Sequence, residues 1–183
     1  MSNRDDFPDS MTKTWDEHKI ASLLRSRYVN EHIDILITFD SQGVSSHPNH
    51  ISLYHGARAF AASLVFMQGT SRRSPVDVYT LTSVNVLRKY TSIVDVFTTL
   101  YLWAMDTRKA TIASGEDSQK QHPENLVFMN DLFGSSGASR GVAWRAMTEA
   151  HQSQMRWFRY GWIILSRYML MNDLKLQHVE VTN

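Results

Sequence analysis

The chain has 183 residues, of which 43% are hydrophobic and 20% charged, a composition typical of one globular domain rather than a disordered or fibrous chain. Lys and Arg number 19 against 18 Asp and Glu, so the net charge is +1. This balance argues against a dedicated nucleic-acid binder, which shows a basic stripe. Cysteine is absent, which excludes a disulfide scaffold, a thiolate zinc finger and a cysteine nucleophile. Without cysteine, the eight histidines are the side chains best suited to bind a metal such as zinc.

Targeting and membrane-spanning segments are not expected in this chain. Residues 1–15 are polar and acidic, without the apolar stretch of a signal peptide. The most apolar region, residues 157–171, is interrupted by Arg159 and Arg167 and is shorter than the roughly 18–20 apolar residues that a membrane helix needs. We expect a soluble chain that can still touch a membrane surface.

The first half of the chain alternates between helix and strand signals after a peripheral segment, residues 1–14. Asp16 suits the cap of a helix that continues to Tyr28. Residues 33–39 are mostly β-branched or apolar and predict a central strand, covered on both faces. Pro48 suits the first turn of a helix over 48–65, and 76–81 predicts a second strand. This order predicts an α/β fold with a mostly parallel sheet flanked by helices.

The second half carries weaker signals. Residues 84–103 suggest a helix or loop first and a strand near 97–102. Residues 113–125 are polar and predict an exposed insertion, and 135–139 resemble a linker. Helical spacing returns over 140–173, which we expect to form a C-terminal helical region with a possible break at Gly161, before a frayed end over 179–183.

The strongest chemical signal is His47-Pro48-Asn49-His50. It follows the first predicted strand and opens a helix, at the strand edge where α/β sheets bind ligands. Residues three apart share a helix face, so both imidazoles can face one cleft. Neutral imidazole is a zinc ligand, and imidazolium can stabilise an oxyanion. The alternative is a chance pair of histidines, one of which caps the helix.

Other candidate residues are open to two interpretations. Asp40 could orient an imidazole from behind or end the strand as a turn residue. Arg88 and His151 could contact a substrate or be ordinary surface and packing residues. The segment His122-Pro123-Glu124-Asn125 is interpreted as a solvated loop. A P-loop, a Gly-x-Gly-x-x-Gly fingerprint and a Gly-x-Ser-x-Gly elbow are absent from the sequence.

The segment over residues 157–169 is rich in Trp, Tyr and Arg. Such residues suit a membrane interface or a protein groove. The alternative interpretation is a core helix with ordinary arginines.

Several of these motifs resemble one family, the GPI-anchor de-N-acetylases, or N-acetylglucosaminyl-phosphatidylinositol deacetylases. The resemblance centres on Ile37-Thr38-Phe39-Asp40-x-x-Gly43-Val44-Ser45-x-His47-Pro48-Asn49-His50. It continues through Asp9-Ser10-Met11-Thr12, Trp15-Asp16, Leu87-Arg88-Lys89-Tyr90, His151-x-Ser153-Gln154, Trp157-Phe158-Arg159 and Ser166-Arg167-Tyr168-Met169-x-x-Asn172. It covers nearly the whole chain except the region 113–125.

The resemblance implies a Rossmann-like α/β fold with one catalytic zinc, and a glycolipid substrate that loses acetate during GPI-anchor assembly at the cytoplasmic face of the endoplasmic reticulum. His50 corresponds to a zinc ligand. His47 corresponds to the residue that stabilises the tetrahedral intermediate. Asp40, Arg88 and His151 are further candidates behind the metal or at the substrate.

One family motif, Ala-His-Pro-Asp-Asp-Glu, is not found in these 183 residues. In the family it follows the first strand and supplies two more zinc ligands and the general base. We therefore expect a single deacetylase-like domain over 1–183 that lacks its first strand and is inactive alone, with an incomplete zinc site. Two alternatives remain: a non-catalytic interaction protein that retains the fold, or a deacetylase of another N-acetylglucosamine conjugate.

Overall fold

The structure is a computed structural model that describes residues 6–68, 74–113, 123–129, 144–150, 152 and 155–179. The chain divides into two compact units. Unit 1 comprises the described parts of residues 1–83, 122–124 and 174–183, and unit 2 those of 84–121 and 125–173. Each unit is described by itself. The predicted insertion (113–125) and linker (135–139) fall largely or wholly outside the described residues.

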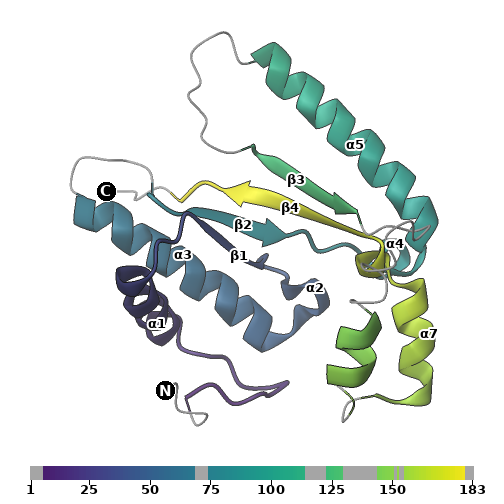
Figure 1. Ribbon diagram of the computed structural model, residues 1–183, viewed down its shortest axis with the longest axis horizontal. Coiled ribbons are helices and arrows are strands. Elements are labelled where there is room, and N and C mark those ends of the chain that lie inside the picture. Colours follow the sequence, from purple (N-terminus) through teal and green to yellow (C-terminus); the bar gives the residue numbers. More distant parts are fainter. Residues whose placement is uncertain are drawn as a thin grey trace. The chain divides into compact units, whose positions relative to one another are not determined.

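Unit 1 is built on helices and strands that alternate along the chain, as the sequence predicts. Its elements are α1 (Glu17–Asn30), β1 (Ile35–Phe39), α2 (Gly43–Ser46), α3 (Pro48–Gln68) and β2 (Asp77–Leu81). The last strand, β4 (Met171–Gln177), ends in this unit (Figure 1). The four described strands have the order β1-β2-β4-β3, with β3 at Asn125–Met129.

The sheet confirms an α/β fold, but it is mixed rather than fully parallel. β1 and β2 are parallel and in register from Ile35–Asp77 to Phe39–Leu81. β4 runs antiparallel to β2, with Val78 opposite Gln177 and Leu81 opposite Leu174. Parallel pairing of β1 and β2 requires a crossover, and α3 supplies it.

Helix α1 begins where the sequence predicts, because Asp16 caps it. The Asp16 carboxylate accepts hydrogen bonds from the backbone N–H groups of His18 and Lys19. These bonds stabilise the charged form, so they lower the pKa of Asp16 below its ordinary value. The cap therefore favours the helix at neutral pH, and this contribution is lost as the pH falls through the lowered pKa.

Helices α1 and α3 lie side by side in unit 1 (Figure 1). A glycine permits their close approach, because a Cβ at Gly56 would lie 2.4 Å from the Ile20 side chain. The apolar face predicted for α3 is buried: Phe60 and Leu64 pack with Ala21 and Val76. A second cluster joins Ala57, Ala61, Val78 and Val179. Of the frayed end predicted over 179–183, Val179 is thus part of the core, and 180–183 lie outside the described residues.

The prediction that the first strand is central and covered on both faces is wrong. Among the described strands β1 lies at the edge of the sheet. Ile35 and Ile37 are 39% and 59% exposed, whereas Leu36 packs against the core. Successive strand residues point to opposite faces, so one face of β1 carries exposed isoleucines. An apolar run does not distinguish an edge strand from a central one.

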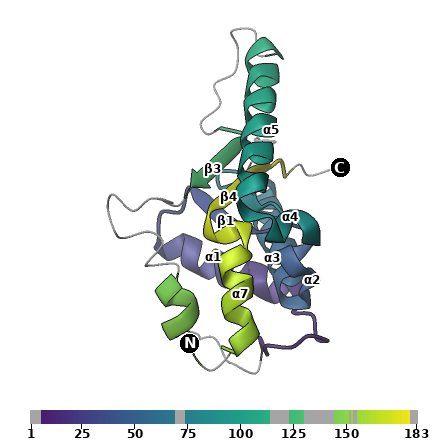
Figure 2. The same ribbon diagram turned by 90° about the vertical axis from the view of Figure 1, so that its right-hand side faces the viewer.

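Unit 2 contains α4 (Val86–Tyr90), α5 (Ser92–Ala113), β3 and a π-helical turn η1 (Ala146–Ala150), followed by α7 (Trp157–Leu165) and a 3-10 turn η3 (Arg167–Met169). Figure 1 and Figure 2 both show α4 beside the N-terminal end of α5. A small core joins Val96 of α5 to Leu170 and Met171, with Leu100 and Val127 packed against it. No described helix is long and apolar enough to cross a membrane.

The strand predicted over 97–102 is wrong, because this segment lies inside α5. Asp95, Val96 and Thr99 are buried on one side of the helix, at helical spacing. The threonine and aromatic residues of this segment have low helix propensity, but tertiary packing outweighs it.

The region 140–173 is helical in part. Gly161 lies inside α7 without breaking it, since a single glycine costs a helix only about 1 kcal/mol. Residues 171–173 belong to β4, which the sequence did not predict. Leu174-Lys175-Leu176-Gln177 alternate between apolar and polar residues, but this short pattern begins only after Asn172 and Asp173, at the end of a region with helical spacing. The sequence also did not predict β3, which begins at Asn125, the last residue of the polar region 113–125.

Candidate active site

A loop joins the end of β1 to the start of α3 and is organised by Asp40. The Asp40 carboxylate accepts hydrogen bonds from the Ser83 hydroxyl (2.6 Å) and the Ser83 N–H (2.6 Å). It also accepts from the N–H groups of Gln42 and Gly43, each at 3.0 Å. These contacts tie the loop to the segment after β2. These contacts favour the second interpretation of Asp40, a residue that shapes the turn at the end of the strand.

The loop backbone is held in an unusual conformation. Gly43, Val44 and Ser46 have φ angles of +61°, +61° and +58°. Positive φ is costly for a β-branched residue, so Val44 is strained and must be held by its surroundings. The Val44 N–H donates to the Ser83 hydroxyl at 2.7 Å. Gly43 also needs the space, because a Cβ there would lie 3.0 Å from the His50 Cβ.

His50 is fixed on two sides in the first turn of α3. Its Nδ1 lies 3.0 Å from the Gly43 carbonyl oxygen, so Nδ1 carries the proton and donates. Its ring stacks on Phe39 at 3.9 Å between centroids, with an angle of 10° between the planes. The Nε2 lone pair is therefore available to a metal ion. A metal-ligating histidine commonly donates its other N–H to a carbonyl in this way.

His47 has the opposite tautomer. Its Nδ1 accepts the backbone N–H of Asn49 at 3.2 Å, so the ring proton is on Nε2. The centroids of the His47 and His50 rings are 5.0 Å apart. The structure thus brings together the two histidines that the sequence pairs, and it gives His47 an Nε2–H donor where His50 has a free lone pair.

Asp9 lies beside this site, although the sequence analysis did not name it as a candidate site residue. Its carboxylate lies 3.8 Å from His47 Nε2 and is largely exposed. The segment before α1 reaches the start of α3 because the Trp15 N–H donates to the Ser52 hydroxyl (2.9 Å). The buried Asn49 amide, with its oxygen toward the Ser10 N–H (3.3 Å), donates to the Lys13 carbonyl (3.0 Å). The sequence signal that could have identified Asp9 is the motif Asp9-Ser10-Met11-Thr12, which belongs to the family resemblance.

A metal-binding group of three or more His, Cys, Asp or Glu side chains is not found among the described residues. His50 fits one position in a metal site, but a catalytic zinc usually takes three protein ligands. His151 lies outside the described residues. The role of His50 as a zinc ligand remains a prediction.

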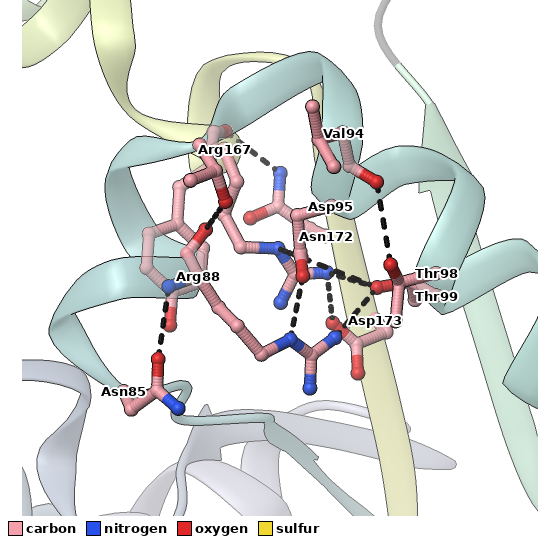
Figure 3. Close-up of polar contacts among 11 residues, drawn as sticks. Asn85, Arg88, Val94, Asp95, Thr98, Thr99, Arg167, Asn172 and Asp173 are labelled. Carbon is pink, nitrogen blue, oxygen red and sulfur yellow. Dashed lines mark hydrogen bonds and ion pairs between the residues drawn. The ribbon is translucent and has the colours of Figure 1, made fainter.

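Arg88 belongs to a separate cluster in unit 2, in which two arginines converge on one buried carboxylate (Figure 3). Asp95 is paired with Arg88 Nε at 2.5 Å and with the fully buried Arg167 at 2.6 Å. Arg167 also pairs with Asp173 at 2.9 Å, and both arginines donate to the Thr99 hydroxyl. The two arginines and the two aspartates of this cluster balance in charge. Through it, Arg88 helps to join α4, α5 and the η3 turn.

The fold and the first of these sites define an α/β protein with a pair of oriented imidazoles at the carboxyl end of a parallel strand. Curated proteins similar to the chain share one name. The N-acetylglucosaminyl-phosphatidylinositol de-N-acetylase of Arthroderma benhamiae is 40% identical over 94% of this chain and 58% of its own length. The probable enzyme of that name from Schizosaccharomyces pombe is 35% identical over 91% of this chain and 56% of its own length. The enzyme of Bos taurus is 33% identical over 95% of this chain and 56% of its own length.

These similarities confirm the relationship to the GPI-anchor de-N-acetylase family that the motifs predict. The chain spans a little over half the length of these relatives. Neither a family model nor a solved structure matches the chain.

We predict that Asp40→Ala lowers the free energy of unfolding by about 2–4 kcal/mol, because hydrogen bonds to a charged group are worth roughly 1.5–3 kcal/mol each and their donors would lose a partner. Urea unfolding measures this loss. Asp34→Ala is the matched control, since Asp34 is exposed just before β1, and we expect it to change stability by less than about 0.5 kcal/mol. Equal stability of both variants would contradict the role of Asp40.

We predict that Asp95→Ala destabilises unit 2 by about 3–5 kcal/mol, because it leaves the buried Arg167 charge without its closest partner. Hydrogen exchange of the α5 amides and urea unfolding would both report the loss. Glu149→Ala removes an exposed pair with Arg145 and should cost less than about 1 kcal/mol. A loss for Asp95→Ala no larger than that of the control would show that the cluster contributes little.

Proposed function

We propose that this chain acts in the removal of acetate from N-acetylglucosaminyl-phosphatidylinositol, a step of GPI-anchor assembly. The observation that carries the proposal is the pair of imidazoles, His47 and His50, held in opposite tautomers at the end of β1. The shared name of the relatives supports the reaction and the glycolipid substrate.

The reaction is the hydrolysis of an amide. Water loses a proton as it adds to the acetamide carbonyl carbon, and the carbonyl oxygen becomes negative. The C–N bond then breaks as the nitrogen takes up a proton, which gives acetate and an amine. The His47 Nε2–H is a donor suited to the developing oxyanion. The departing nitrogen needs a proton, and His47 Nε2, which lies 3.8 Å from the Asp9 carboxylate, is the group that we propose to deliver it.

We propose zinc as the metal of this reaction, with His50 Nε2 as one of its ligands. Neutral imidazole is a common zinc ligand, and the Gly43 carbonyl holds the His50 ring in the required tautomer. When bound, zinc would polarise the carbonyl and lower the pKa of its water. The described residues supply only this one position of a ligand set, so no further step is assigned to the metal.

A lipid-linked substrate requires the enzyme to work at a membrane surface. We propose the cytoplasmic face of the endoplasmic reticulum, following the family resemblance. The lack of a membrane-spanning helix among the described residues is compatible with peripheral contact.

We predict negligible acetate release by residues 1–183 alone. A lone imidazole binds zinc weakly, since affinity comes from several deprotonated ligands in fixed geometry. General-base help is worth roughly 10²–10⁴ in rate, and no residue here matches the family's general base. Fusion behind a family segment that carries the His-Pro-Asp-Asp-Glu run should restore zinc binding and turnover. Robust turnover by the unfused chain would show that the metal site is elsewhere.

In that fusion we predict different effects for the two histidines. His50→Ala should abolish tight zinc binding. His47→Ala should retain zinc and lower kcat by about 10²–10³, the cost of one oxyanion donor. His55→Ala is the matched control, because His55 is exposed on the same helix, and it should leave both quantities unchanged.

Zinc content and acetate release measured together test these roles. Loss of zinc in His47→Ala, or full turnover in His50→Ala, would overturn the assignment. Turnover on a soluble N-acetylglucosamine conjugate but not on the phosphatidylinositol-linked sugar would favour the alternative substrate class.

A further inference from the structure

The peptide group between Gly43 and Val44 is held at both of its ends. Its carbonyl oxygen, which belongs to Gly43, accepts a hydrogen bond from His50 Nδ1 at 3.0 Å. Its N–H, which belongs to Val44, donates to the Ser83 hydroxyl at 2.7 Å. His50 and Ser83 therefore hold opposite ends of one planar group, and all four residues belong to unit 1.

The planarity of the peptide group couples these two contacts. In a trans peptide the N–H and the C=O lie in one plane and point in opposite directions, so neither turns without the other. A group that fixes the direction of the Val44 N–H also fixes the direction of the Gly43 carbonyl. The Ser83 hydroxyl is such a group, and it acts on His50 through the backbone.

The Ser83 hydroxyl is itself oriented by Asp40. A hydroxyl has one proton to donate, and this one goes to the Asp40 carboxylate at 2.6 Å. Because a carboxylate only accepts, the lone pairs of the Ser83 oxygen are left for the Val44 N–H. The Ser83 N–H donates to the same carboxylate at 2.6 Å, which fixes the position of the serine.

The backbone does not favour this orientation of the peptide group by itself. Val44 has a φ of +61° and a ψ of −37°. This combination lies outside the left-handed helical region, where ψ is about +30 to +60°. A β-branched residue keeps such a conformation only where its surroundings impose it. A half-turn of the peptide group would direct the carbonyl oxygen away from His50 Nδ1 and the N–H toward it.

The direction of the peptide group selects the tautomer of His50. A carbonyl oxygen beside Nδ1 requires the ring proton there and leaves a lone pair at Nε2, whereas an N–H beside Nδ1 requires the ring proton at Nε2. Only the first tautomer offers Nε2 to a metal ion. The stack of His50 on Phe39 orients the plane of the ring but does not distinguish the two tautomers.

We propose that Ser83 is a positioning residue. Its hydroxyl orients the Gly43–Val44 peptide group, and this group keeps His50 in the tautomer that has a free lone pair at Nε2. The inference rests on the proposed function only for the use of that lone pair by a metal. The tautomer is a property of the chain alone and is measurable whether or not the chain takes part in deacetylation.

NMR of the ¹⁵N-labelled chain of residues 1–183 tests the proposal, because a protonated ring nitrogen and one with a lone pair have different chemical shifts. At about pH 8, where an imidazole is neutral, His50 should carry its proton on Nδ1 and the Val44 amide should exchange slowly with solvent. Ser83→Ala should give a mixture of both His50 tautomers and speed the exchange of the Val44 amide by about tenfold or more.

Two further variants separate this role from a general loss of stability. Ser83→Thr retains the hydroxyl and should restore the His50 signal of the unchanged chain. Ser63→Ala is the matched control, because Ser63 is a half-buried serine of α3 whose hydroxyl donates to the Phe60 carbonyl at 2.6 Å. It should leave the His50 tautomer and the Val44 exchange rate unchanged. Circular dichroism would verify that each variant is folded.

Zinc binding by the fusion with the family segment gives a second measurement. Ser83→Ala should weaken zinc binding by about 10–100-fold, the usual cost of losing a group that orients a metal ligand, and Ser63→Ala should not weaken it. If the unchanged fusion binds no zinc, the proposed function fails, and the NMR result still decides the role of Ser83.

Three NMR results would overturn the proposal. The first is a His50 proton on Nε2, or rapid exchange of the Val44 amide, in the unchanged chain. The second is an unaltered His50 tautomer in folded Ser83→Ala, and the third is an equal change in Ser63→Ala. The first of these results needs no variant, so the proposal is open to refutation even if Ser83→Ala does not fold.

Discussion

One carboxylate determines the geometry of the candidate site. Asp40 accepts from two groups of Ser83 and from two backbone N–H groups of its own loop. These bonds help to hold the loop in which Val44 has a positive φ angle, a costly conformation for a β-branched residue. The resulting turn points the Gly43 carbonyl at His50. The imidazole pair therefore depends on a residue that has no described contact with either ring.

Buried charge has a comparable role in unit 2. Asp95 lies between two arginines that come from segments almost 80 residues apart in the chain, and Thr99 bonds to both arginines. Burying such a cluster gives little net stability, but leaving one of its charges unpaired is costly. The arrangement thus favours one way of joining α4, α5 and the η3 turn. The motifs Leu87-Arg88-Lys89-Tyr90 and Ser166-Arg167-Tyr168-Met169 meet here, which gives both a structural reason.

The sequence predicted the elements whose burial follows a regular period. The face of α3 from Tyr54 to Val65 and the start of α1 at Asp16 are confirmed, as is the strand β2. The helix α5 and the strand β4 were missed, because tertiary packing outweighs the β-branched residues of one and the polar residues of the other. At the site, the pairing of His47 with His50 followed from their spacing. The contacts from Ser83 and Asp9 cross about 40 residues and leave no local pattern.

The two histidines are chemically distinct although they are three residues apart and identical. A carbonyl oxygen faces Nδ1 of His50, and a backbone N–H faces Nδ1 of His47. The first neighbour requires a proton on Nδ1 and the second forbids one in the neutral ring. One ring therefore presents a lone pair at Nε2 and the other an N–H, which is the difference between a metal ligand and a hydrogen-bond donor. Backbone groups of the loop and of the first turn of α3 make this distinction, so the roles follow from the fold of the segment 40–50.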